Sequence, residues 1–344
     1  MNKEARQQQI IQLVQQLGGQ RMLGTRELAL KFGVTEMTVR RDFQELSLRG
    51  LFRRKYGGVS PLPRSADQLR KEIGIWLVSQ TGKYTDPFFN AILEGADRKL
   101  HDLGYRITYV NTRTEVNTVE RSRDLLHSHP VDGIILVGYI GTESVKYLKK
   151  HVRAIVQTIE LVGDNLDTVT FDGYSGMRQM VDHLVERGYR RLGFISGGSD
   201  LRLKAFMDGI QAHGLPADAN LRVLLPFGLD GWTPELGHVG AQKLMALRKP
   251  PDAIVCASDR IAIGAIQWLY QHNISVPADV AITGFDDILE AQFTAPPLTT
   301  VHVHKQLMGE LAAERIVKRI ENENEVPLFI ETPTHLVIRR SCGG

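Results

Sequence analysis

The sequence is poor in cysteine and has no long apolar run. Its 344 residues include two cysteines, Cys256 and Cys342, which are too few for the disulfide framework of a small secreted protein. No stretch of about 18 consecutive apolar residues occurs, so no transmembrane helix is expected. The polar N-terminus, MNKEARQQQIIQLVQQL, lacks the apolar core of a secretory signal. We therefore expect a cytoplasmic protein with no membrane partner.

The sequence also has little net charge, but that charge is unevenly distributed. The total is +3, whereas residues 1–60 contain eleven Lys or Arg against five Asp or Glu, which leaves +6 there and −3 elsewhere. A length of 344 residues exceeds what a single core usually supports, so we expect two or three domains. A basic head on a weakly acidic body indicates a polyanion-binding module joined to another domain. A solvated basic face without a partner is the alternative.

The first sixty residues predict three short helices followed by a hairpin. The first helix has an apolar face and would end at Gly18-Gly19. Thr25 would cap the second helix, Gly33 would turn the chain, and Thr35 would cap the third helix. A helix, a short turn that contains glycine, and another helix form the helix-turn-helix pattern. The segment LFRRKYGG at 51–58 then predicts a small hairpin, the wing of a winged helix.

The third helix is amphipathic in a way that suits a DNA groove. Val39, Phe43 and Leu46 share one apolar stripe, while Arg, Met, Thr and Gln side chains lie outside it. In the major groove, Arg can contact guanine through two hydrogen bonds or bind phosphate. The residues that we predict to bind DNA are Thr25, Thr35, Met37, Thr38, Arg40, Arg41, Gln44, Arg53, Arg54 and Lys55.

The run ELALKFGVTEMTVRRDFQELSLRGLFRRKYGG closely resembles the DeoR-type winged helix-turn-helix of bacterial repressors. The resemblance covers residues 6–59 and includes the VT-x-x-TVRRD core and the R-R-x-x-GG wing. It implies that the helix with Thr38, Arg40 and Arg41 is the recognition helix, and that double-stranded operator DNA is its partner. A winged helix that contacts protein instead of DNA is the alternative.

Beyond a linker with two prolines, apolar strands alternate with amphipathic helices. The strand-like runs are IGIWLVS, ITYV, GIILVG, RLGFIS, AIVCAS and VAITGF. This alternation predicts parallel sheets flanked by helices, an α/β fold. LHDLGYRITYV at 100–110 and LVERGYRRLGFI at 184–195 resemble each other, which hints at two lobes of one plan. Ligands of such sheets bind beyond the carboxyl ends of the strands, so two lobes would form a hinged cleft.

Polar and aromatic side chains gather just after these predicted strands. Carboxylates and arginine can bind sugar hydroxyls through charge-assisted hydrogen bonds, and aromatic rings can stack on the apolar face of a sugar. Each residue also has a structural alternative. Asp86 could merely cap a helix that starts with Pro87, Trp232 could belong to a core, and Asp286-Asp287 could cap a turn.

These segments resemble, in order, the motifs of the lactose/galactose-repressor (LacI/GalR) sensor domain, which has the periplasmic-binding-protein type I fold. The motifs are DPFFNAILEGADRKLHDLGY, VDGIILVG, TFDGYSGMRQMVDHLVERGYRRLGFISG, RLKAFMDGI, PDAIVCASDRIAIGAI, VAITGFDD and PPLTTVHVHKQLMGELAAERI, and they span about residues 73–341. The resemblance implies a homodimeric transcriptional regulator with a small-molecule effector. It places at effector-contacting positions Asp86, Phe88, Phe89, Arg202, Trp232, Ser258 and Asp286.

The chain departs from that family at three places. The family often has Asn or Asp where Ser258 stands, and a position near Val303 that is commonly polar is apolar here. The family also carries its own helix-turn-helix and a hinge helix, whereas this chain has a DeoR-type head and a linker with prolines. The hinge mechanism of the family therefore does not carry over.

No motif predicts a metal, a cofactor or catalysis. TGK at 81–83 lacks the first glycine and the Ser or Thr of a phosphate loop. His302 and His304 would share one side of a strand, but the sequence suggests no third ligand. No nucleophile and base stand out, so we expect no enzyme, although a sugar-processing enzyme is one alternative.

We therefore predict a DeoR-type winged helix-turn-helix at 1–60, a linker at 61–71 and a two-lobed α/β sensor at 72–344. The predicted function is sequence-specific DNA binding that regulates transcription, in a repressor controlled by a mono- or disaccharide. The alternative is a cytoplasmic sugar-binding or scaffold protein whose winged helix contacts protein.

Overall fold

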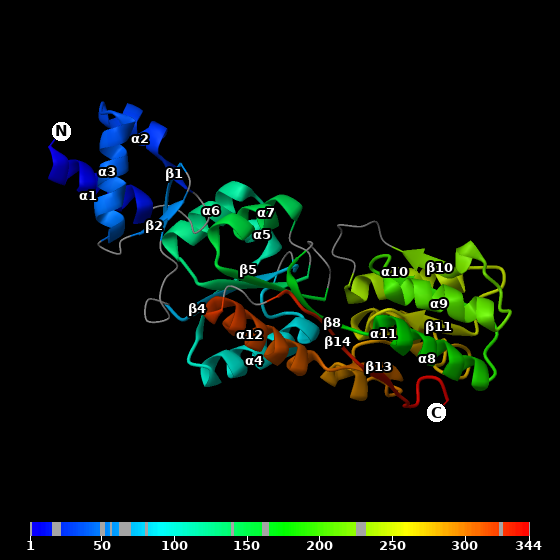
Figure 1. The fold of residues 1–344 in the computed structure, drawn as a ribbon. Helices are drawn as coiled ribbons and strands as arrows, with labels where there is room; N and C mark the ends of the chain where they lie inside the picture. The colour runs from blue at the N-terminus through cyan, green and yellow to red at the C-terminus, as the bar shows by residue number, and fades with distance from the viewer. Residues whose placement is uncertain are drawn as a thin grey trace. The chain divides into compact units, whose positions relative to one another are not determined.

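The computed structural model describes residues 2–15, 22–48, 52–55, 57–61, 70–79, 82–138, 141–159, 165–224, 232–322 and 326–343. It contains two compact units (Figure 1). The first comprises Met1–Val78, Asp97–Thr168 and Ala312–Leu328, and the second comprises Ser79–Ala96, Val169–Leu311 and Phe329–Gly344. No described helix combines the length and the hydrophobicity that a membrane span requires.

The N-terminal part of the chain forms the predicted helices and hairpin. Its helices are α1 (Lys3–Gln15), α2 (Thr25–Phe32) and α3 (Glu36–Leu48), and its strands are β1 (Leu23–Gly24), β2 (Phe52–Lys55) and β3 (Gly58–Pro61). The strands form an antiparallel sheet in the order β1-β3-β2, so the predicted wing gains a third strand. The predicted stripe of Val39, Phe43 and Leu46 is buried, and Phe43 packs edge-on against Phe52 of the wing.

Two predicted helix ends can be compared with this structure. Gly24, not Thr25, is the N-cap of α2. Thr25 is its first helical residue, is buried, and donates its hydroxyl to the carbonyl of Gly57. The prediction that Thr25 caps α2 was wrong because the chain enters the helix directly from β1. Gly33 ends α2 in the left-handed conformation, as predicted, whereas Gly18-Gly19 lies outside the described residues.

A six-stranded sheet follows, in the order β14-β8-β7-β6-β4-β5. Its strands are β4 (Glu72–Leu77), β5 (Arg106–Thr112), β6 (Gly133–Val137), β7 (Ala154–Thr158), β8 (Asp167–Phe171) and β14 (Phe329–Thr332). The helices that accompany it are α4 (Pro87–Asp102), α5 (Arg113–Val116), α6 (Val119–Ser128), α7 (Thr142–His151) and α12 (Lys305–Glu321). On one face, Trp76 and Leu136 pack with Leu148 of α7. On the other face, Ile316 of α12 lies against Gly133, where a Cβ would stand 2.7 Å from the Ile316 side chain.

The second sheet has four parallel strands in the order β10-β9-β11-β12. They are β9 (Leu192–Ser196), β10 (Arg222–Leu224), β11 (Ala253–Cys256) and β12 (Ala281–Thr283). The associated helices are α8 (Gly173–Glu186), α9 (Leu201–Ala212), α10 (Pro234–Met245) and α11 (Asp259–Gln271), with 3₁₀ turns at Ala219–Leu221 and Leu289–Gln292. Ile195 faces the core formed by α10 and α11, and Phe194 stacks on Phe206 of α9, so helices cover both faces. An antiparallel pair, β13 (Thr300–Val303) and β15 (Thr334–Val337), completes this part.

The two sheets share one plan. Each places its second strand beside its first, followed by its third and fourth: β5-β4-β6-β7 and β10-β9-β11-β12. The prediction of two α/β lobes is confirmed. The two similar sequence segments do not occupy equivalent positions in the two lobes. LHDLGYRITYV leads into the second strand of its lobe, β5, whereas LVERGYRRLGFI leads into the first strand of the other lobe, β9.

Candidate DNA-binding and effector sites

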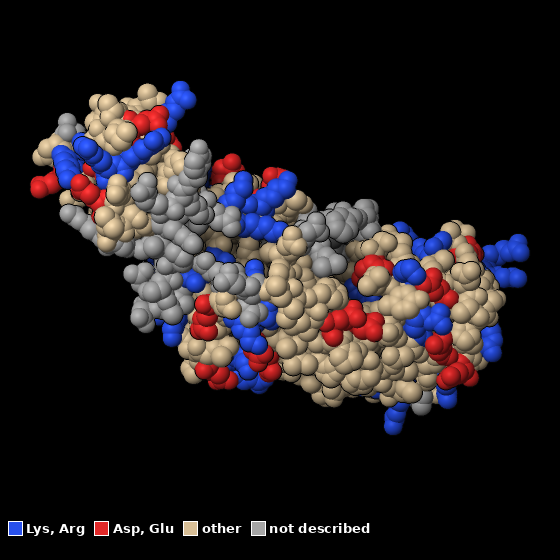
Figure 2. Space-filling view, viewed as in Figure 1, with Lys and Arg blue, Asp and Glu red and all other residues tan. Residues whose placement is uncertain are grey.

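Helix α3 presents the side chains that the sequence assigns to DNA. Met37, Arg40, Arg41 and Gln44 are exposed, Thr38 is half-buried, and their spacing of three and four residues places them along one side of the helix. Arg40 forms only a loose ion pair with Glu36, with 3.6 Å between the charged atoms. Arg41 forms no ion pair with any described residue. Blue Lys and Arg side chains stand out over this domain in Figure 2 (upper left). Such exposed cations can reach phosphate or a base edge.

A buried cluster and an exposed N-cap fix α3 in place. Asp42 is 1% exposed and accepts hydrogen bonds from Arg6 (Nε–Oδ2, 2.6 Å) and Gln7 of α1. Thr35 accepts the backbone N–H of Thr38 at 3.2 Å and so caps α3, as predicted. Asp42 belongs to the RRD run quoted above, yet it holds the helix and does not face solvent.

The remaining residues predicted to bind DNA differ from these. Thr25 is buried and its hydroxyl is bound to the carbonyl of Gly57, so a contact of Thr25 with DNA stays a prediction. The backbone of Arg53, Arg54 and Lys55 runs along β2, but their side chains lie outside what the structure describes.

The predicted effector residues all lie in the second unit, and most follow the carboxyl ends of its parallel strands. Arg202 is the second residue of α9, after β9. Trp232 lies between β10 and α10, Ser258 lies after β11, and Asp286 lies after β12. Because the strands are parallel, these residues share one edge of the sheet.

Arg202 lies at the centre of a set of aromatic rings. Its guanidinium carbon is 4.3 Å from the ring centre of Trp232, 5.4 Å from that of Phe285 and 5.8 Å from that of Phe171. The side chain also donates to Asp200 and, at 2.7 Å, to the carbonyl of Ala257. These contacts hold an almost buried cation in one orientation, with its charge partly balanced by a carboxylate and by ring faces.

Phe88 and Phe89 extend this aromatic set. Phe88 meets Phe171 at 6.1 Å and Phe89 at 5.8 Å between ring centres, both edge-on, and Phe171 in turn lies 5.9 Å from Phe285. The structure therefore brings both predicted phenylalanines into one cluster with Arg202 and Trp232.

Asp86 has two roles in the structure. Its Oδ1 accepts the N–H of Phe88 at 2.9 Å, so Asp86 caps α4, which is the structural role that the sequence analysis gave as the alternative. Its Oδ2 accepts from Arg260 Nη1 at 2.6 Å. Ser258 also has a structural role, because its hydroxyl accepts the N–H of Ile261 and caps α11.

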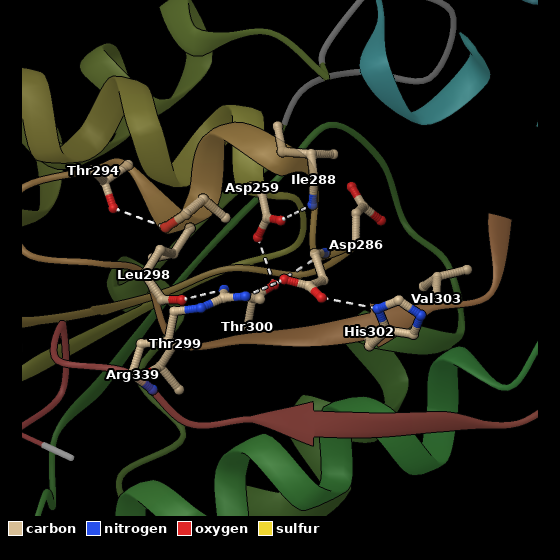
Figure 3. A network of polar contacts seen from close by, with 12 residues as sticks. Asp259, Asp286, Ile288, Thr294, Leu298, Thr299, Thr300, His302, Val303 and Arg339 are labelled. Atoms are coloured by element: carbon tan, nitrogen blue, oxygen red, sulfur yellow. Dashed lines mark hydrogen bonds and ion pairs between the residues drawn. The ribbon is translucent and has the colours of Figure 1, made fainter. Parts of the chain in front are cut away.

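Asp286 carries a buried carboxylate. The residue is 7% exposed, and its side-chain oxygens accept no hydrogen bond from any described residue. In Figure 3 the Asp286 carboxylate stands apart from the hydrogen bonds that join Asp259 to Thr300 and Ile288. Burial raises the pKa of Asp286 well above its ordinary value, although Arg202 acts against this shift. A buried acceptor without a donor is costly unless a ligand supplies one.

The backbone at this position is strained and needs support. Asp286 and Asp287 have φ values of 114° and 54°, in the region that side chains other than glycine avoid. Buried Lys305 donates its ammonium group to the carbonyls of Asp286, Asp287 (3.1 Å) and Val303 (3.2 Å). Asp287 is bound by Arg339 and His302, at 2.6 and 2.8 Å. Lys305 therefore positions the Asp286 turn, a role that the sequence did not reveal.

Asp259 lies beneath this turn. It is fully buried, accepts from Thr300 at 2.5 Å and from the N–H of Ile288 at 2.8 Å, and burial raises its pKa to about 7. Its hydrogen bonds join α11 to the segment after β12, so it supports the site from within the protein.

His335 lies opposite His302 across the β13–β15 pair, with 4.9 Å between ring centres, and His304 is 4.8 Å from His302. His335 is thus a third histidine beside His302 and His304, which the sequence did not suggest. Even so, within the described ranges no group of three or more such side chains is arranged to hold a metal ion.

Comparison with known proteins identifies the chain. A family model described as a DeoR-like helix-turn-helix domain matches residues 6–62, and one described as a periplasmic-binding-protein-like domain matches residues 181–342. The HTH-type transcriptional repressor PurR of Actinobacillus pleuropneumoniae serotype 3 is 30% identical over 265 residues, which are 74% of this chain and 77% of the relative. The chain belongs to the LacI/GalR-type family of transcriptional regulators.

One further relative and one solved structure match most of the chain. The HTH-type transcriptional repressor MelR of Bacillus subtilis is 28% identical over 348 residues, or 94% of this chain and 98% of the relative. A structure titled as the complex of the transcriptional regulator CelR with cellobiose has a TM-score of 0.70 at 24% identity. It covers 90% of this chain and 91% of that one, and it shows the fold. The predicted DeoR-type head, two-lobed sensor fold and class of regulator are confirmed.

Proposed function

We propose that this LacI/GalR-type regulator binds operator DNA through α3 and senses an uncharged sugar at the edge of its four-stranded sheet. The observation that carries the sugar assignment is Asp286, whose buried carboxylate has no hydrogen-bond donor among the described residues. Sugar hydroxyls would supply such donors, and Arg202 beside it offers donors to sugar oxygens. The rings of Trp232 and Phe88 can pack on the apolar face of a sugar. The cellobiose complex of CelR supports the same class of ligand.

The proposal extends to the assembly. Two copies would bind a palindromic operator, with α3 of each copy in successive major grooves about 34 Å apart. Sugar binding changes operator affinity only to the extent that the sugar prefers one of the two states of the protein. We assign no catalytic role to the site.

The function is tested with the full chain. A duplex selected from a random library gives the operator, and its affinity is measured over a series of salt concentrations with and without cellobiose, D-ribose or D-galactose. We expect a steep decrease in affinity with salt, because bound phosphates release counterions, and a change in affinity with one sugar. If the affinity for the duplex did not change with salt concentration, a winged helix that contacts protein would be favoured. If none of these sugars raises the melting temperature of the protein, the sugar assignment is contradicted.

A further inference from the structure

Arg260 occupies a position that local structure disfavours. It is the second residue of α11, after the Ser258 cap and Asp259. The N-terminus of a helix carries a partial positive charge, so the first turn favours Asp or Glu over a cation. Residues that break a local rule are often found at functional sites. Arg260 lies beyond the carboxyl end of β11, on the sheet edge that also carries Arg202 and Asp286.

The partner of Arg260 is a predicted effector residue. Arg260 Nη1 donates to Asp86 Oδ2 at 2.6 Å, while the other oxygen of Asp86 caps α4. The Asp86 side chain is 11% exposed and the Arg260 side chain 25% exposed, so the pair is largely shielded from solvent. The negative charge of Asp86 also contributes to the raised pKa of Asp286, the buried carboxylate of the candidate effector site.

The pair keeps unused hydrogen-bonding capacity of both kinds. A guanidinium has five N–H donors, and Arg260 uses one of them on the described residues, toward Asp86. A carboxylate has about four lone-pair positions, and described residues occupy two of those of Asp86. Donors and acceptors therefore lie side by side in one ion pair.

We propose that Arg260 is a specificity-determining residue of the effector site, an inference that rests on the proposed sugar function. Arg260 donates a hydrogen bond to one hydroxyl oxygen of the sugar, while Asp86 accepts a hydrogen bond from the adjacent hydroxyl. The ion pair thus selects a vicinal diol, and a sugar that lacks one of those two hydroxyls leaves a shielded donor or acceptor unpaired.

The test compares Arg260→Met and Arg260→Lys with a matched control in the full chain. Arg178→Met is that control, because the Arg178 side chain is also 25% exposed and paired with an aspartate, Asp182, on the outside of α8. The probes are cellobiose, D-ribose, 2-deoxy-D-ribose, D-galactose, its monodeoxy analogues and D-galactonate, measured by titration calorimetry. Affinity for the selected operator duplex shows that each variant is folded.

We expect Arg260→Met to weaken binding of the sugar that the wild type prefers by about tenfold or more. It should also abolish the discrimination against one deoxy analogue, with partial recovery in Arg260→Lys and no change in Arg178→Met. If the wild type binds a sugar and Arg260→Met binds it with the same affinity, the role of Arg260 is overturned but the proposed sugar function is not. Tighter binding would overturn that role too, because Arg260 would then compete with the sugar for Asp86. A preference of the wild type for D-galactonate would overturn the inference, because Arg260 would then recognise an anion and not a vicinal diol. No binding of any probe to the wild type would overturn both proposals.

Discussion

The arginines of the N-terminal domain and those of the effector site differ in their surroundings. The Arg40 side chain is 57% exposed with one loose partner, whereas the Arg202 side chain is 10% exposed and held by Asp200 and three aromatic rings. Exposed cations act on phosphate over distance and are weakened by salt. A buried and oriented cation acts only at contact and is little affected by salt. Burial, more than residue type, therefore decides which partner an arginine recognises in this protein.

Within the N-terminal domain, Arg6 differs from the exposed arginines because it is buried and paired with Asp42. Breaking this pair gives the largest expected effect. Asp42→Ala leaves the Arg6 charge buried without its partner, which costs about 3–5 kcal/mol. We expect the N-terminal domain to unfold and operator binding to be lost, while the sugar-induced thermal shift remains. Chemical denaturation followed by circular dichroism, with an operator titration, measures this.

The control for Asp42→Ala is Lys3→Ala, which removes an exposed ion pair with Glu45 and should cost at most about 1 kcal/mol. Equal stability of the two variants would show that the buried pair does not hold α3 in place.

The exposed arginines are tested by Arg40→Ala combined with Arg41→Ala. Loss of two contacts of about 1–3 kcal/mol each should lower operator affinity by about 30-fold or more. If both bind phosphate, the slope of log K against log salt becomes shallower by about 1.8. Fluorescence anisotropy with the selected duplex measures both quantities. A variant with the affinity and slope of the wild type would remove α3 from the DNA interface.

The buried side of the comparison is tested by Asp286→Asn. Loss of charge-assisted hydrogen bonds should weaken sugar binding by about 1.5–3 kcal/mol without affecting operator binding. The folded-state pKa of Asp286 lies above its ordinary value of 3.8, so the stability of the wild type falls as pH rises from 3.8 through that raised pKa. Asn does not ionise, so the variant should be more stable than the wild type near pH 7 but not near pH 3.

Thermal unfolding of both proteins at the two pH values measures this difference for Asp286→Asn. A variant that is less stable at every pH would show that Asp286 is a structural residue, and the sugar assignment would lose its main support.

Much of this organisation could be predicted from the sequence, because it depends on local patterns. The apolar stripe of α3, the turn at Gly33 and six strands follow from spacing and turn residues. These strands are β4, β5, β6, β9, β11 and β12. The strands β1, β7, β8, β10, β14 and β15 were missed. Of these, β10 has three residues, and β14 and β15 carry exposed positions that blur the apolar pattern.

The site could be predicted only in part, for a different physical reason. Residues that follow strand ends, such as Arg202 and Asp286, were found because sheet topology places them together. Lys305 and Arg260 were missed because their roles depend on partners 18 and 174 residues away, Asp287 for Lys305 and Asp86 for Arg260. No spacing rule connects such pairs. The roles of the predicted site residues and the domain boundaries at 60 and 72 stay predictions.

The smallest expected effect concerns how the exposed arginines are positioned. Thr35→Ala removes the cap of α3, where the Thr35 hydroxyl accepts the N–H of Thr38, and should cost about 1 kcal/mol of stability in the N-terminal domain. Operator affinity should fall by less than in the arginine variants, because both arginines remain, while its salt slope stays that of the wild type. Thr35→Ser keeps the hydroxyl and should behave as the wild type. If Thr35→Ala instead made the slope shallower, Thr35 would hold a phosphate contact and would be more than a cap.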